Sequence, residues 1–235
     1  MNNTTSYLLL AALLTAGVTF ALIKHKLTPL AALTGVVVAL LLFAAGGFTG
    51  VMLMTVFFII GTAVTSHKKA LKQQTGADNI NAPRDSRQVL ANSGMAAILA
   101  ILILLLPGYK TLFTMMIAAA FATASGDTAS SELGMVYGRK FYNIITLKKD
   151  ARGLDGVISL EGTLLGIAAS MVIAAVYAIY FGWGWSFAVL TLSGLTGNLT
   201  DSLLGAVLER KHRLGNNMVN FLATLAGALA AWLLA

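Results

Sequence analysis

Two acidic residues stand inside short polar patches that interrupt apolar parts of the chain. Asp127 lies in the patch 125–134 and Asp201 in the patch 196–205. A carboxylate at the centre of a membrane helix makes insertion of that helix less favourable by about 2.5–3.5 kcal/mol, so it usually has a function or a cationic partner. Solubilising charge at the membrane interface is the alternative, and it suits Asp78, Asp150 and Glu209 better. Carboxylate, hydroxyl and amide oxygens together suit Mg²⁺ better than zinc.

The two patches align with each other at an offset of 71 residues, as Gly197 does with Gly126. Chance similarity between helices rich in small residues explains the glycines and serines, but not an acid in each copy. We therefore predict a parallel repeat of two helical hairpins. Helical spacing gives each copy one polar face, and opposed faces would bring Asp127 and Asp201 together. The two faces consist of Asp127, Ser131 and Gly134, and of Asn198, Ser202 and Gly205.

A third polar cluster follows the longest loop, residues 66–83. Pro83 is placed to open a helix, from which Arg84, Gln88 and Asn92 recur at a spacing of four residues. The guanidinium group of Arg84 suits phosphate, and anchoring the helix at anionic headgroups is an equally good alternative. The two amides need hydrogen-bond partners wherever they enter a bilayer.

A glycine-rich fourth cluster spans residues 153–163. Ser159 and Thr163 share a helix face, with Glu161 beside it. A glycine-rich turn before a helix exposes N–H groups that favour anions. On its own this signal is weak, because glycines begin many membrane helices.

The elements that position these clusters follow from composition. The 235 residues are 57% hydrophobic and 11% charged, against about 25% charged in a soluble domain. A membrane-spanning helix needs roughly 17–25 mostly apolar residues. We therefore predict an all-α, polytopic membrane protein with a single domain, residues 1–235, and about eight transmembrane helices. The predicted helices are 6–23, 28–45, 48–65, 89–106, 111–130, 158–181, 184–206 and 217–235, of which the last four form the two repeated hairpins.

The cations fall on alternate connections between these helices. Of the 16 lysines and arginines, all but Lys110 belong to one side. The positive-inside rule then places both termini outside, and the four clusters on the cytoplasmic face of an inner membrane. This topology also accounts for the net charge of +7, so we expect no nucleic-acid partner. Whether the protein is a monomer or a homodimer stays open.

Some kinds of chemistry are excluded by what the sequence lacks. Cysteine is absent, which rules out thiolate catalysis and cysteine-ligated metal. The phosphate-loop motif of common kinases is absent too. His25, His67 and His212 show no spacing typical of metal ligands.

At the four clusters the chain resembles a known integral-membrane family. That family includes the phytyl-phosphate kinases of the plant vitamin E (tocopherol) pathway and the transmembrane protein 19 group. The resemblance covers roughly residues 30 to 235, with departures at Ser93 and Asn198. The matching motifs are Arg84-x-x-x-Gln88-Val89-x-x-Asn92, Ser125-Gly126-Asp127-Thr128-x-x-Ser131-Glu132-Leu133-Gly134, Gly156-Val157-Ile158-Ser159-Leu160-Glu161-Gly162-Thr163 and Gly197-x-x-x-Asp201-Ser202-Leu203-Leu204-Gly205-Ala206.

The resemblance implies a kinase that converts a prenyl monophosphate, such as phytyl phosphate, to the diphosphate. CTP or another nucleoside triphosphate would be the donor, and membrane lipid would surround the apolar substrate. On this reading Asp127 and Asp201 bind Mg²⁺. Glu132 and Glu161 either bind the metal too or hold its ligands in place from behind. Arg84 joins Asp127, Asp201 and Glu161 in catalysis. Arg139 and Lys140 either bind phosphate or simply follow the positive-inside rule. The residues expected to hydrogen-bond the nucleotide or phosphates are Gln88, Asn92, Ser131, Ser159, Thr163, Asn198 and Ser202.

Two other functions fit parts of the same pattern. A transporter of a small phosphorylated or anionic solute is one, although transporters usually place their polar residues near the bilayer midplane. A CTP-dependent lipid cytidylyltransferase is the other. It would release pyrophosphate and form a CDP-lipid, whereas a kinase releases CDP.

Overall fold

The computed structural model describes residues 3–73 and 82–235, so Asp78 lies outside the described residues. Within them the chain is almost entirely helical, and the predicted all-α fold is confirmed. Three short helical turns, α4 (Lys69–Gln73), η1 (Pro107–Tyr109) and the π-type turn η2 (Gly205–Glu209), join or extend the long helices. The long helices are α1 (Asn3–Ile23), α2 (Pro29–Gly46), α3 (Phe48–Ser66), α5 (Ser86–Leu105), α6 (Lys110–Tyr137), α7 (Leu160–Phe181), α8 (Trp185–Leu204) and α9 (Asn216–Leu234).

These eight long helices correspond to the eight predicted spans. Seven of the helices in the described ranges are long and apolar enough to cross a membrane. The exception is α8, which has 20 residues. Its Asn198 and Asp201, together with several glycines and hydroxyl side chains, lower its mean hydropathy. The polar residues that suggest chemistry thus also weaken the membrane signal of the helix that carries them.

Helix ends follow from local sequence. Gly47, with φ +68°, turns the chain between α2 and α3, as the predicted tight hairpin requires. Helix α5 begins at Ser86 with Asp85 as its N-cap, in a reciprocal capping box with Gln88. The prediction that Pro83 opens this helix is therefore wrong by three residues, because Asp85 satisfies the first free N–H groups. Arg84 instead pairs with the α1–α2 connection, where its N–H donates to the Lys26 carbonyl at 2.9 Å.

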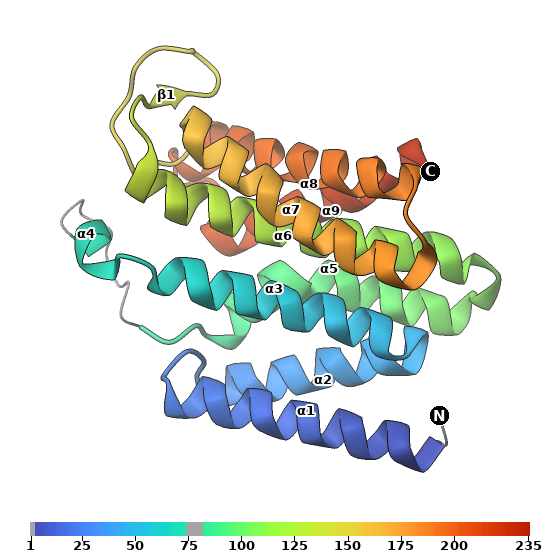
Figure 1. The fold of residues 1–235 in the computed structure, drawn as a ribbon. Helices are drawn as coiled ribbons and strands as arrows, with labels where there is room; N and C mark the ends of the chain where they lie inside the picture. Colours follow the sequence, from blue (N-terminus) through green and yellow to red (C-terminus); the bar gives the residue numbers. More distant parts are fainter. Residues whose placement is uncertain (1–2, 74–81) are drawn as a thin grey trace.

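Helix α6 forms the centre of the bundle (Figure 1). Every residue from 114 to 126 is buried, and small residues let the neighbouring backbones approach closely. A Cβ placed on Gly166 of α7 would lie 2.7 Å from the carbonyl oxygen of Gly126. The chain termini lie at the same end of the bundle, and α6 and α8 run in the same direction (Figure 1). A parallel repeat of the two hairpins remains a prediction.

A short antiparallel ribbon folds the α6–α7 connection back on itself. Strands β1 (Tyr142–Asn143) and β2 (Val157–Ile158) pair Tyr142 with Ile158 and Asn143 with Val157. The ribbon and α4 lie at the end of the bundle away from the termini (Figure 1). That end holds the polar clusters.

Candidate active site

A polar pocket of about 500 Å³ opens at this end of the bundle. Its walls come from the ends of α3, α5, α6 and α8, from the connection that carries the ribbon, and from η2 and the start of α9. Ten of the residues singled out by the sequence line it together. They are Arg84, Gln88, Asn92, Asp127, Ser131, Glu132, Ser159, Asn198, Asp201 and Ser202.

Asp127 and Asp201 meet in this pocket. Their carboxyl groups lie close enough to interact directly. Oδ2 of Asp201 is buried and has no hydrogen-bond partner within the described chain. Among the ion pairs of the described residues, none includes either acid. Two adjacent carboxyl groups with an unsatisfied oxygen are an arrangement that a bound cation stabilises.

Close helix packing explains how the two acids come together. A Cβ on Gly197 would overlap the side chain of Thr123 in α6, so only glycine allows α8 to lie so near. Asn198 is buried on the same turn, and its amide nitrogen would lie 2.8 Å from a Cβ on Gly166. Gly166 and Gly197 therefore allow the close helix packing that positions the acids.

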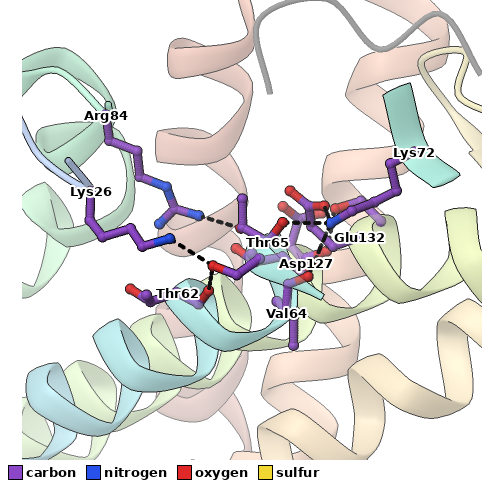
Figure 2. A network of polar contacts seen from close by, with 11 residues as sticks. Lys26, Thr62, Val64, Thr65, Lys72, Arg84, Asp127 and Glu132 are labelled. Atoms are coloured by element: carbon purple, nitrogen blue, oxygen red, sulfur yellow. Dashed lines mark hydrogen bonds and ion pairs between the residues drawn. The ribbon is translucent and has the colours of Figure 1, made fainter. Parts of the chain in front are cut away.

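Glu132 forms an ion pair with Lys72 (Figure 2). Lys72 is fully buried, and its Nζ also donates to the carbonyls of Val64 at 3.1 Å and Thr65 at 2.7 Å at the end of α3. A cation is favoured there by the helix dipole. Glu132 was predicted as a metal ligand. In this structure its charge faces a lysine, and Asp127 lies beside the pair (Figure 2).

Arg84 reaches the pocket from the extended segment before α5. Its guanidinium group lies against Gly61 of α3, since a Cβ added to that glycine would be 3.3 Å from Nη1. Nη2 donates a hydrogen bond to Thr65 Oγ1 at 3.1 Å. Burial lowers the pKa of Arg84, and the charge of Glu132 partly opposes this effect. A partly buried guanidinium group of this kind is well suited to bind an anion.

The remaining polar side chains of the lining are held by local bonds. Gln88 Oε1 accepts from the Asp85 N–H at 3.0 Å, and the Asn92 amide donates to the Gln88 carbonyl at 3.0 Å. Ser131 donates to the Asp127 carbonyl at 3.0 Å. Ser159 caps α7 by accepting from the Gly162 N–H. These bonds fix the side chains along the pocket wall.

Four predicted site residues do not line the pocket among the residues described. Glu161 accepts from the Arg139 backbone N–H at 3.3 Å and faces Arg139 Nε at 4.0 Å. The side chain of Arg139 is 88% exposed. Lys140 is also exposed, and Thr163 donates to the Ser159 carbonyl at 3.0 Å. The structure thus gives Glu161 an arginine partner away from the Asp127–Asp201 pair.

Sequence reasoning missed several residues that line the pocket. Asp155 and Glu209 add two carboxyl groups, and Asn216 and Asn220 add amides from the first turns of α9. Burial, followed by the charges of Asp155 and Asp201, raises the pKa of Glu209 to about 7. The spacing of the two asparagines, four residues apart at the start of a span, was the signal that could have found them.

The tight turn at Gly156 brings the ribbon connection against η2. Gly156 has φ +71°, and a Cβ there would overlap Ala206. This contact sets Asp155 beside η2, close to Glu209. A left-handed conformation and the absence of a side chain are both needed here, which only glycine supplies.

The residues present fit a magnesium ion shared with substrate. Among the described residues, no group of three or more acidic or histidine side chains is arranged to hold a metal. Mg²⁺ usually takes only one or two carboxylates from a protein and completes its shell with water and phosphate oxygens. Asp127 and Asp201 meet that requirement.

Comparisons with known proteins place this chain in a family. The model of the family described as integral membrane protein DUF92 matches residues 12–228. Protein VTE6, chloroplastic, of Arabidopsis thaliana is 34% identical over 199 residues, 81% of this chain and 60% of that protein's length. The uncharacterized membrane protein MJ0933 of Methanocaldococcus jannaschii is 34% identical, with 78% of this chain and 75% of that protein aligned. The uncharacterized membrane protein sll0875 of Synechocystis is 33% identical, with 88% and 82% aligned.

These matches confirm the resemblance that the four motifs carry. The chain spans 60% of the length of protein VTE6 of Arabidopsis. No solved structure matches it.

Proposed function

Because this chain belongs to the DUF92 integral membrane protein family, we propose that it is a membrane kinase for a prenyl monophosphate such as phytyl phosphate. The proposed phosphoryl donor is a nucleoside triphosphate, and CTP is our first choice among them. The single observation that carries this proposal is the meeting of Asp127 and Asp201 in a polar pocket that Arg84 also lines. A cation held by the two acids, together with the guanidinium group, would neutralise the charge of bound phosphates.

The reaction joins two polyanions. An oxygen of the acceptor monophosphate attacks the γ-phosphorus of the nucleotide, and the bond from that phosphorus to the β–γ bridging oxygen breaks. The products are a prenyl diphosphate and a nucleoside diphosphate. The second pKa of a phosphate monoester is near 6, so the acceptor is mostly a dianion at neutral pH and needs no general base.

Positioning and charge neutralisation dominate the catalysis of phosphoryl transfer. Asp127 and Asp201 would hold Mg²⁺, which neutralises phosphate charge when bound. Arg84 binds the acceptor phosphate through its guanidinium fork. Asn198 and Ser202, on the same helix as Asp201, donate to nucleotide oxygens. Arg139 and Lys140 are left with the role of interfacial cations, since both lie outside the lining.

We place the pocket at the cytoplasmic face of the membrane, with both termini on the other side. The common end of the two termini (Figure 1) and the alternation of cations support this orientation. A nucleotide then arrives from the cytoplasm while the prenyl chain stays in lipid.

The test is to identify the products made by the purified protein. We expect phytyl phosphate, Mg²⁺ and CTP to give phytyl diphosphate and CDP, as measured by mass spectrometry, with each other nucleoside triphosphate compared in parallel. A CDP-lipid together with pyrophosphate would instead show a cytidylyltransferase. Uptake of a phosphorylated solute into proteoliposomes, without any lipid product, would show a transporter.

A further inference from the structure

A second, mostly apolar cavity of about 620 Å³ lies between α1, α2, α3 and α5. We call it the apolar groove. Side chains such as Leu13, Val36, Met54 and Phe58 form its walls. Its volume is within the range of ligand sites, about 300–1,000 Å³. It is separate from the polar pocket along most of its length.

The groove and the polar pocket meet at one place. Arg84, Gln88 and Asn92 line both. The guanidinium of Arg84, lying across Gly61, therefore stands in the wall between an apolar space and a polar one. A molecule that lay in the groove with its head at Arg84 would have that head in the pocket of Asp127 and Asp201.

The groove is basic at the end that it shares with the polar pocket. Lys24, Lys26 and Arg84 line it there, and Lys26 Nζ donates to Ser66 Oγ at 2.8 Å. Figure 2 shows Lys26 and Arg84 extending side by side toward α3. From Lys24 the groove follows α1 as far as Leu13, a rise of about 16 Å at 1.5 Å per residue. The shape and charge fit one long apolar chain that ends in an anion.

We propose that the apolar groove binds the isoprenoid chain of the acceptor lipid and delivers its monophosphate to Arg84, Gln88 and Asn92. This inference rests on the proposed kinase function for the identity of its occupant. The groove sets the length of chain that the enzyme accepts, because the wall residues of α1 and α2 contact the chain far from the reacting phosphate.

Two glycines allow the groove to be filled without disturbing the bundle. Among the described residues, a Cβ on Gly17 of α1 meets nothing within 4 Å, and one on Gly35 of α2 meets only Met54 Cε at an ordinary 3.7 Å. Both line the groove. Gly17→Leu and Gly35→Leu therefore place new side chains in its open space. Gly46→Leu is the matched control, since its Cβ also meets nothing within 4 Å and Gly46 is not part of the groove lining.

The binding experiment uses a geranylgeranyl monophosphate analogue that carries a photoreactive diazirine at the end of its chain. We expect it to label groove residues such as Leu13 and Val36 of the full chain in nanodiscs. Labelling should fall roughly tenfold in Gly17→Leu, because the new side chain fills space that the lipid chain would occupy. A difference of one methylene group in an apolar pocket changes binding by at least this factor. Gly46→Leu should label as the unsubstituted protein does. Equal labelling in all variants, or labelling spread over exposed residues such as Leu8 and Ile179, would overturn the inference.

A competition arm separates the substrate from ordinary bilayer lipid. Unmodified geranylgeranyl monophosphate should suppress the labelling, and an equal amount of phosphatidic acid should not. Equal suppression by both would mean that the groove is a general site for anionic lipid, which contradicts the proposal.

Kinetics distinguish failure of this inference from failure of the kinase assignment. In Gly17→Leu we expect KM for geranylgeranyl monophosphate to rise roughly tenfold, with KM for five-carbon dimethylallyl monophosphate unchanged. Product formation with no such change would reject the groove and leave the kinase. Groove labelling without product from any nucleoside triphosphate would reject the kinase and leave a prenyl-phosphate binding site.

Discussion

The carboxyl groups of Asp127 and Asp201 interact directly at one end of the helical bundle, although 74 positions (201 minus 127) separate them in the chain. Each comes from a different helix, and glycines such as Gly197 let those helices approach. Oδ2 of Asp201, which has no hydrogen-bond partner among the described residues, lies within this arrangement.

Removing either acid should abolish turnover but leave the fold intact. We expect Asp127→Asn and Asp201→Asn each to lower kcat by about 10²–10³-fold or more, the range for loss of one group that stabilises transition-state charge. Kinase assays on purified variants measure this. Asp85→Asn is the matched control, because asparagine also serves as an N-cap and Asp85 is outside the pocket lining. Turnover near the normal rate in either pocket variant would remove the assignment of the pair to metal binding.

Magnesium should stabilise the folded protein through the same pair. A ligand that binds only the folded state adds about 2.7 kcal/mol at a hundred times its dissociation constant. We expect Mg²⁺ to raise the Tm of the unsubstituted protein in detergent. The increase should vanish in Asp127→Asn and persist in Asp85→Asn. An increase of the same size in all three proteins would mean that the cation acts elsewhere.

The Lys72–Glu132 pair should be important for stability, although Lys72 is fully buried and the Glu132 side chain is 20% exposed. Removing one partner of a fully buried ion pair typically costs about 3–5 kcal/mol, and we expect a smaller loss here because water partly screens Glu132. Lys72→Met should therefore lower Tm. Adding Glu132→Gln to Lys72→Met should restore part of the loss, since no isolated carboxylate remains. A double variant as unstable as the sum of the single changes would show that the two side chains are not coupled.

Arg84 and Arg139 should behave differently. Hydrogen bonds to charged groups contribute about 1.5–3 kcal/mol, so Arg84→Lys, which loses the fork geometry, should raise KM for the prenyl phosphate about 10–100-fold. Arg139→Lys should have little effect, because that side chain is exposed outside the pocket. Steady-state kinetics at saturating nucleotide measure both. A larger rise in KM for Arg139→Lys than for Arg84→Lys would mean that the phosphate binds near the ribbon and not at Arg84.

Glu209 should make stability fall as pH rises toward neutrality. Burial raises its pKa from 4.5 to about 7, so between these values the folded protein binds more protons than the unfolded chain. Its contribution is then most favourable below pH 4.5 and is lost as pH rises to 7. Asp150 has the opposite sign, since its bonds to Arg210 lower its pKa. We therefore compare Tm of the unsubstituted protein with that of Glu209→Gln. The variant should gain relative stability from pH 5 to pH 8, and a constant difference would contradict the shift.

The proposed orientation can be tested directly because the chain has no cysteine. Gly108 and Lys149 are both exposed and lie on opposite sides in the proposed topology. In sealed right-side-out vesicles an impermeant maleimide should label Gly108→Cys and leave Lys149→Cys unlabelled until the membrane is opened. The reverse pattern would place the pocket outside the cell.

Local sequence was enough to find the helices and the end of the bundle that holds the polar residues. Apolar runs of membrane-spanning length define the helices, because backbone groups in lipid must bond within their own segment. The small residues around the two acids predicted close packing but not the right partners. Gly126 and Gly134 of α6 pack against α7, and Gly197 of α8 packs against Thr123 of α6. Even the hydropathy of α8 is a local property, lowered by the polar residues that line the pocket.

Only the tertiary structure decided which charges face each other. Glu132 and Glu161 look alike as acids within motifs, yet one faces Lys72 and the other Arg139, because an ion pair depends on which segments become neighbours. Arg84 enters the pocket from an extended segment that pairs with the α1–α2 connection, not from the predicted helix. The apolar groove has no sequence signal at all, since a cavity arises from the spaces left among four helices and not from the pattern of any one of them.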